Sequence, residues 1–369
     1  MVNYPSDWEE MTLQEFTEIN PNTTIPNKFN YVDLESVKDV SLVNLRREDK
    51  ITAPSRARRY AQKGDIFFQT VRPYQKNNYN FKLDGDYVFS TGYAQLRVKA
   101  NNDSNFLFYL IRHDNFVNEV LSNCTGTSYP AINPTVLSNI RIHVPPLAEQ
   151  QAIADTLTAF DTHIANLAEL IEKKKAIRDG ALEDLVSGRT RLPGFDYKWE
   201  DSHIGKILKI LHGKNQRQVE ATNGHYPIMG TGGIIGRATD YLCDWECVLI
   251  GRKGTINQPY YMNTPFWTID TLYYSKPAEN QCVKFQYYLF RTISWYDYTE
   301  SSGRPSLTRK AIEGIEIKLP RYEEQKAIAD VLTAMDDEIK ALEDERNKII
   351  QIREGAMDDL LTGRVRLSV

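Results

Sequence analysis

Basic and amide side chains crowd one stretch of the N-terminal half of this sequence. Residues 45–82 carry about ten Lys or Arg against about three Asp or Glu, interleaved with Tyr60, Tyr74 and Tyr79. Cationic groups bind phosphate oxygens, guanidinium groups also read guanine O6 and N7, and amides read adenine. The composition therefore predicts a surface that binds nucleic acid. The candidate DNA contacts here are Arg56, Arg58, Arg59, Lys63, Gln69, Arg72, Tyr74 and Lys76.

The C-terminal half has a comparable supply of basic and amide residues on shorter segments that contain glycine. These segments cover residues 213–218, 250–255 and 301–310. A single arginine in such a segment is more often a solvated surface residue, so only the clusters carry the prediction. The candidate contacts are Lys214, Gln216, Arg217, Arg237, Arg252, Lys253, Arg304 and Arg309.

Residues that could carry catalysis or bind a metal form no convincing set. Glu316 and Lys318 resemble the acid-and-lysine end of a nuclease strand, but their repeat equivalents are Arg141 and His143, which favours a half-buried strand. The CX3C spacing of the 243–247 cysteines is poor evidence for zinc because no second pair follows. The sequence also lacks a Walker-type phosphate loop. We therefore expect no catalytic residue, no metal site and no cofactor bound by this chain.

The segment that follows each basic region of the sequence occurs twice. Residues 149–192 reappear as residues 324–367 without a gap, at a constant offset of about 175 and with roughly half of the positions identical. Upstream the two halves diverge, although each opens on a similar tryptophan motif, at Trp8 and at Trp199. The chain is therefore a tandem duplication in which a variable body precedes a constant tail.

Each tail is predicted to be a long amphipathic helix. Apolar residues recur in steps of three and four, no proline interrupts them, and Gly188 and Gly363 look like helix ends. A single helix cannot bury such a stripe alone, which favours pairing of the two tails over two unrelated core helices. The predicted pairing residues are Ile153, Leu157, Phe160, Ile164 and Leu167 in the first tail, and Ile328, Leu332, Met335, Ile339 and Leu342 in the second.

The variable bodies are strand-rich, with short helices predicted at residues 105–121 and 282–293. Strands and helices that do not alternate regularly indicate an α+β fold class. The boundaries that follow are a first body at 1–146, a helical region at 147–190, a second body at 191–321 and a C-terminal helical region at 322–369.

Composition excludes several classes of protein. A chain of 369 residues that is 41% hydrophobic and 25% charged should fold, as more than one domain. Four cysteines are too few for a disulfide scaffold, and neither a signal peptide nor an apolar run long enough for a membrane span is evident, so we expect a cytoplasmic protein. The net charge of −4 conceals an uneven distribution: residues 147–188 carry about −4 and residues 323–363 about −7, which leaves about +7 for the rest.

The repeated tail motif resembles the specificity subunit of type I restriction-modification systems. The resemblance rests on PPLAEQQAIADTL and LPRYEEQKAIADVL, on LVSGRTRL and LLTGRVRL, and on the body segments APSRARRYAQKGDIFFQTVRP, YPIMGTGGIIG and VLIGRKGT. It covers the whole chain. One small departure is Leu319-Pro320-Arg321, where the first copy has Val144-Pro145-Pro146.

The resemblance implies a non-catalytic protein that determines which DNA sequence the complex recognises. Two target recognition domains would each read half of a bipartite double-stranded DNA site, and two conserved helices paired antiparallel would set the spacing. Two modification (methyltransferase) subunits would dock on these helices and restriction subunits would complete the assembly. S-adenosylmethionine, ATP and Mg would then belong to these partner subunits. From the residues alone, a coiled-coil scaffold with two protein-binding modules remains the alternative.

Overall fold

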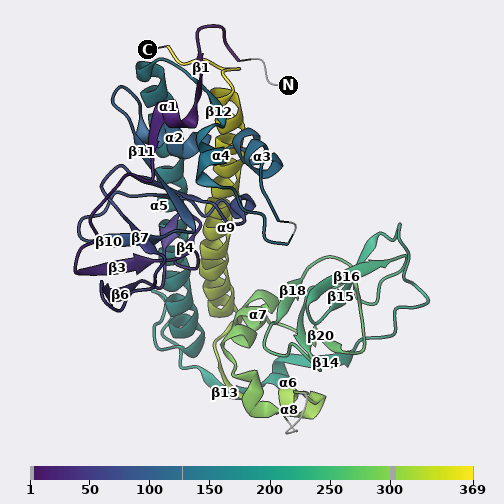
Figure 1. Cartoon of the computed structure of the whole chain (residues 1–369). Coiled ribbons are helices and arrows are strands. Elements are labelled where there is room, and N and C mark those ends of the chain that lie inside the picture. Colours follow the sequence, from purple (N-terminus) through teal and green to yellow (C-terminus); the bar gives the residue numbers. More distant parts are fainter. Residues whose placement is uncertain (1–3, 127, 300–304, 369) are drawn as a thin grey trace. The chain divides into compact units, whose positions relative to one another are not determined.

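The computed structural model describes residues 4–126, 128–299 and 305–368, in two compact units. Unit 1 comprises Met1–Leu167 with Glu345–Val369, and unit 2 comprises Ala168–Asp344. Helices α5 (Leu147–Ser187) and α9 (Tyr322–Leu361) confirm the two predicted helical tails, and Figure 1 shows both as long unbroken helices. Each of them contributes one part of its length to each unit. Among the described residues, no helix is long and apolar enough to cross a membrane.

Unit 1 holds two four-stranded sheets. The first has the strand order β6 (Arg46–Asp49), β3 (Lys28–Val32), β10 (Tyr87–Ser90), β7 (Ala57–Tyr60), in which only β3 and β10 are parallel. The second is antiparallel, in the order β2 (Thr17–Ile19), β11 (Tyr93–Val98), β8 (Ile66–Gln69), β9 (Tyr79–Asn80). Two-stranded pairs join β1 (Glu9–Thr12) to β12 (Arg141–Val144) and β4 (Val37–Lys38) to β5 (Ser41–Leu42).

The remaining elements of unit 1 are short helices. They are α1 (Leu13–Phe16), the 3-10 helix η1 (Pro73–Gln75), α2 (Ser104–Leu110), α3 (Asp114–Ser122) and α4 (Pro134–Ser138). The single helix predicted at residues 105–121 is therefore wrong, since two helices stand there. Asp103 caps the first of them and the His113 side chain caps the second, so the backbone breaks between them.

Unit 2 has the same class of elements in a different arrangement. An antiparallel sheet has the order β14 (Leu208–His212), β20 (Leu272–Pro277), β17 (Cys247–Gly251), β18 (Tyr260–Met262). A second sheet has the order β16 (Gly233–Ala238), β15 (Tyr226–Gly230), β19 (Trp267–Thr268), and β13 (Glu200–His203) pairs with β21 (Glu316–Leu319). The helices are α6 (Ile204–Ile207), α7 (Val283–Thr292), the 3-10 helix η2 (Trp295–Tyr298) and α8 (Arg309–Glu313). The mixed composition of both units agrees with the predicted α+β class.

The main core of each unit joins a body to the ends of both long helices. In unit 1, Ile153 and Leu157 of α5 and Leu360 of α9 belong to the same buried cluster as Phe16 and Phe106. In unit 2, the corresponding cluster contains Leu182 and Leu185 of α5 and Ile328 and Leu332 of α9. The predicted apolar stripe is thus buried partly by the bodies. The helices are built into the two units and are not separate from them.

Both long helices end on a glycine that a tryptophan covers. Gly188 and Gly363 have φ of +74° and +70°, and a Cβ at either position would lie 3.3 Å or less from ring atoms of Trp199 or Trp8. Only glycine combines a left-handed backbone with so close an approach. The predicted helix ends are confirmed, and the paired tryptophan motifs are explained by the same contact.

Candidate DNA-binding surfaces

The turn that follows β8 in unit 1 is held rigidly by two buried side chains. The Gln69 amide donates to Val71 O and to Gln75 Oε1, both at 2.8 Å, and Gln69 Oε1 accepts from Asn77 N at 3.2 Å. Asn78 Oδ1 accepts from Gln69 N at 2.8 Å. These bonds fix residues 69–78 in one conformation, in which Arg72 and Lys76 have positive φ.

Gln69 therefore positions the turn, although it also lies in the wall of a cavity beside it. Its side chain is 1% exposed and its amide is committed within the turn, whereas the sequence predicted a base contact. Gln75 and Asn77 lie on the surface that Gln69 supports. Sequence composition does not distinguish these amides, because it carries no information on which of them is buried.

Two adjoining cavities open beside this turn and share Leu34, Glu35 and Val71. The first, about 490 Å³, is lined by Lys38, Arg72, Gln75 and Asn77 among others. The second, about 750 Å³, is lined by Arg46 and Arg56 among others. We call this continuous hollow the unit 1 groove. It combines cationic and amide side chains, as a surface that binds phosphates and bases requires.

Aromatic rings hold two of the groove arginines. Arg72 lies over the Tyr129 ring at 4.2 Å from its centroid, and Arg46 lies over the Tyr31 ring at 5.4 Å while pairing with Asp33 at 2.8 Å. Tyr129 is 65% exposed, so the stacked pair reaches solvent. Stacking restricts the guanidinium planes while leaving donors available.

The other candidates of unit 1 lie in three kinds of environment. Arg56 and Arg58, just before and on β7, are exposed, as is Tyr74. Arg59 is half-buried, burial lowers its pKa, and its buried Nε lacks a hydrogen-bond partner among the described residues. Lys63 and Lys76 already pair with carboxylates, with Asp84 at 2.6 Å and Asp114 at 2.5 Å respectively.

In unit 2 the turn between β19 and β20 gathers three of the predicted cations. Lys214 N donates to Thr268 O at 2.8 Å, Arg252 N donates to Thr271 O at 2.8 Å, and Lys253 follows Arg252. Gly213 permits this approach, because a Cβ there would lie 2.0 Å from Ile269 O. Lys214 and Lys253 are exposed, and Arg252 is half-buried.

The remaining candidates of unit 2 are spread over other elements. Gln216 and Arg217 lie on the loop before β15, and Arg237 is exposed on β16. Arg309, on α8, pairs with Glu313 at 2.8 Å. Arg304 lies outside the described residues.

The predicted pairing residues differ in burial. Ile153, Leu157, Leu167, Ile328, Leu332 and Ile339 are buried, whereas Phe160, Ile164, Met335 and Leu342 are half-buried. Ion pairs join the two helices inside each unit. Arg353 of α9 pairs with Asp161 of α5 at 3.0 Å in unit 1, and Arg178 of α5 pairs with Asp336 of α9 in unit 2.

These two ion pairs belong to a polar network that occurs once in each unit. Asp161 also accepts a hydrogen bond from Tyr109 at 2.8 Å, and Asp336 accepts one from Tyr288 at 2.9 Å. Burial raises the pKa of Tyr109 to about 12. Sequence reasoning missed these residues, although Asp161 and Asp336 occupy equivalent positions of the repeat.

A second ion pair between residues at equivalent positions of the repeat occurs once in each unit. Arg366 pairs with Glu149 at 2.6 Å and lies over the Trp8 ring, and Arg191 pairs with Glu324 at 2.6 Å. Both glutamates are 2% exposed. A buried carboxylate needs such a partner. In each unit, an arginine at the end of one repeat copy therefore pairs with the glutamate at the start of the long helix of the other copy.

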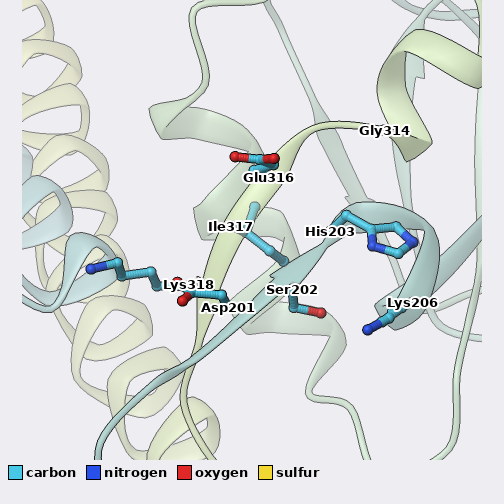
Figure 2. A pocket seen from close by; sticks show the side chains of 8 residues that line it. All are labelled: Asp201, Ser202, His203, Lys206, Gly314, Glu316, Ile317 and Lys318. Atoms are coloured by element: carbon cyan, nitrogen blue, oxygen red, sulfur yellow. The ribbon is translucent and has the colours of Figure 1, made fainter.

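Neither of the alternative chemical sites gains support from its geometry. A cavity of about 840 Å³ is lined by residues of β13 and β21, and Figure 2 shows Glu316, Lys318 and His203 spread along the strands without converging on one point. Cys243 and Cys247 are buried with their sulfurs 3.9 Å apart. In the part of the chain that the structure describes, no three His, Cys, Asp or Glu side chains are grouped to hold a metal ion.

Comparison with protein families matches residues 5–175 and 197–351 to the type I restriction modification DNA specificity domain. The putative type I restriction enzyme MjaX specificity subunit of Methanocaldococcus jannaschii is 24% identical to this chain over 410 residues, covering 98% of this chain and 95% of the relative. The MjaVIII specificity subunit of the same organism is 25% identical, covering 72% of this chain and 71% of the relative.

Solved structures share the fold along almost the whole chain. The HsdS subunit from Thermoanaerobacter tengcongensis is 23% identical with a TM-score of 0.54, covering 98% of both chains. The S subunit of a type I restriction-modification system from M. genitalium is 18% identical with a TM-score of 0.65, covering 97% of this chain and 96% of that one.

Proposed function

The chain belongs to the type I restriction-modification DNA specificity family, and from this premise we propose that each unit reads one half of a bipartite DNA site. The observation that carries the proposal is the duplication itself. Two equivalent polar networks hold two bodies whose basic surfaces differ. Such a chain would carry two different DNA-recognition surfaces on two equivalent helical tails.

Unit 1 would bind DNA through its groove. Arg56 and Arg58 would contact phosphates at the exposed edge, and Gln75, Asn77 and Arg72 would face base edges. Unit 2 would use Lys214, Arg252 and Lys253 on phosphates. Ion-paired Lys63 and Lys76 would contribute less, since DNA must compete with the carboxylates that they already bind.

The two long helices would pair as an antiparallel coiled coil along their length and act as a spacer. Helix α5 contains 41 residues, which corresponds to about 60 Å at about 1.5 Å per residue. One turn of B-DNA spans about 34 Å, so a spacer of this length fits half-sites several base pairs apart.

Two modification subunits would dock on equivalent outer faces of these helices. Ile177 of α5 and Ile352 of α9 are equivalent in the repeat and are 60% and 44% exposed. One turn further on, Gly180 and Gly355 are also equivalent, and a Cβ at either would meet no atom within 4 Å. Glycine inside a helix costs about 1 kcal/mol relative to alanine, and the packing of this chain does not require it here. An exposed isoleucine beside an open glycine suits a closely packed partner helix.

Catalysis would reside in the partners. Modification subunits would bind S-adenosylmethionine, restriction subunits would bind ATP and Mg, and this chain would bind no cofactor. We place the assembly in the cytoplasm, where its DNA lies.

A footprint on a random-sequence DNA library, recorded with the modification subunits present, tests the proposal against the alternative of a protein scaffold. We expect protection of two short fixed sequences at a constant separation. A scaffold with two protein-binding modules would leave no such bipartite protection, and that result would refute the proposal.

A further inference from the structure

A hairpin of unit 2 exposes two consecutive isoleucines. Ile234 and Ile235 of β16 are 68% and 50% exposed, at the end of a glycine-rich turn. Figure 1 shows β15 and β16 at the edge of unit 2 away from α7 and α8. Scattered single apolar residues are normal on a surface, whereas adjacent ones on a protruding hairpin indicate a contact.

A β-bulge causes the double exposure. Gly236 pairs with Ile228, and Ile234 pairs with Met229, so Ile235 falls in the register shift between them. Successive residues of a regular strand alternate between faces, but a bulge turns an extra side chain outward. The turn is also anchored, because Tyr260 Oη donates to Thr231 O at 3.1 Å. The isoleucines are therefore presented on a fixed backbone.

Two of the predicted cations lie near this tip. Ile234 is paired with Met229, Met229 with Thr268, and Thr268 O accepts from Lys214 N, so Lys214 lies along the same row of the sheet. Strands are about 4.8 Å apart, which places this cation about 10–15 Å from Ile234. Arg237 is exposed two residues beyond Ile235 on β16, where its Nη1 donates to His225 O at 3.3 Å and the Glu220 carboxylate lies over Gly236.

We propose that Ile234 and Ile235 contact thymine methyl groups in the major groove of the second half-site, while Lys214 and Arg237 bind the flanking phosphates. This inference rests on the proposed function. A two-stranded ribbon fits the major groove, and the thymine methyl is the apolar group that base edges present there. Cations beside an apolar tip match a groove bordered by phosphates better than they match an apolar protein surface.

The experiment uses the full chain assembled with its modification subunits and a duplex that carries the bipartite site. Affinity is measured by fluorescence anisotropy for the wild type and for the double variant Ile234→Ser/Ile235→Ser. Each duplex is tested with thymine and with uracil, which lacks the methyl group, in the second half-site. The matched control is Val136→Ser, an exposed β-branched residue of α4 in unit 1.

We expect uracil to weaken wild-type binding about four-fold per contacted methyl, and the double variant to bind both duplexes equally. The dependence of binding on salt should not change in the variant, since both cations still bind their phosphates. The control should keep the four-fold difference between thymine and uracil.

Three results would overturn the inference. They are equal binding of thymine and uracil duplexes by the wild type, an unchanged uracil effect in the double variant, and failure of that variant to assemble with modification subunits, which would make the tip a protein contact. If the wild type shows no bipartite preference at all, the proposed function fails instead. The two failures are therefore distinguishable.

Discussion

The folding stability of unit 1 depends on pH through the imidazole of His143. Its imidazole stacks on Tyr4, with ring centroids 3.8 Å apart, and lies 4.0 Å from Glu10. Burial lowers the pKa of His143 below its ordinary value of 6.5, against the opposing effect of Glu10. The unfolded chain therefore takes up this proton first, and folding stability falls as pH drops from about 6.5 through the lowered pKa.

We predict that His143→Phe, which keeps the ring stack, flattens the pH dependence of the unfolding free energy below about pH 6.5. Chemical denaturation between about pH 5 and about pH 8 measures this. Glu10→Gln should steepen the same dependence, because it removes the group that opposes the shift. A His143→Phe profile parallel to that of the wild type would contradict the assignment.

The exposed residues Arg56, which lines the unit 1 groove, and Arg58, on β7, should contribute salt-dependent affinity. We predict that Arg56→Ala/Arg58→Ala reduces the slope of log K against log salt by up to about 0.9 for each phosphate that the variant no longer binds. Titrations with DNA at several salt concentrations measure the slope. Lys99→Ala is the control, since its ammonium binds Gln14 O at 2.6 Å. A slope equal to that of the wild type would place the two arginines away from DNA.

Sequence composition identified the basic stretch but not the role of each residue within it. Gln69 and Gln75 have the same side chain and both line the groove, yet Gln69 is 1% exposed and supports the turn whereas Gln75 is exposed to solvent. That distinction depends on tertiary packing, which local sequence does not encode. Ion pairs such as that of Lys76 with Asp114, which lie 38 residues apart in the sequence, cannot be predicted from local sequence for the same reason.

At the scale of elements, the helices α5 and α9 could be predicted closely because an apolar repeat without proline leaves few alternatives. Their polar contacts could not be predicted, since Asp161 or Asp336 on a helix suggests a solvated position until its partner is known. Equivalence in the repeat was the available signal. The bodies were harder still, because short strands such as β19 depend on pairing partners distant in sequence.

We predict that Asp336→Asn lowers the free energy of unfolding by about 1–3 kcal/mol, because it weakens the hydrogen-bonded ion pair with Arg178, whose side chain is 14% exposed. Asp161→Asn should have a similar effect. Asp344→Asn, which removes the exposed pair with Lys340, should cost about 0.3–0.5 kcal/mol. Equal effects for the half-buried pairs of the network and the exposed pair would refute the structural role of the duplicated network.

The open helical glycines allow stability and docking to be separated. We predict that Gly180→Leu leaves the thermal stability of the isolated chain unchanged or higher, because leucine favours helix and the site is open. The same substitution should block one modification subunit, and Gly355→Leu the other. Mass measurement of the assembled complex should show one modification subunit in place of two. A full complement in both variants would place docking elsewhere.

At the scale of the whole molecule, the spacer proposal predicts a change in the separation of the half-sites. We expect seven residues inserted after Leu167 and seven after Asp344 to lengthen both helices by about 10 Å, which corresponds to about three base pairs. Site selection from a DNA library measures the separation. An unchanged gap with the same half-sites would show that the helices do not set the spacing.

The uneven charge is a property of the whole molecule that composition could reveal only when it was divided along the chain. The net charge of −4 combines acidic helices with a remainder of the chain that carries about +7. Some acidic side chains of the long helices form ion pairs with lysines, such as Glu338 with Lys174 at 2.7 Å and Glu343 with Lys175 at 2.8 Å. A chain of this charge can therefore present basic surfaces to DNA.

We propose that this one chain determines both halves of the DNA sequence that its modification subunits methylate. Methylome sequencing of cells that express this chain with its modification subunits tests the claim most directly. We predict new methylation confined to one bipartite motif, with two fixed half-sites and a constant gap between them. Methylation in a single contiguous motif, or without sequence preference, would contradict it.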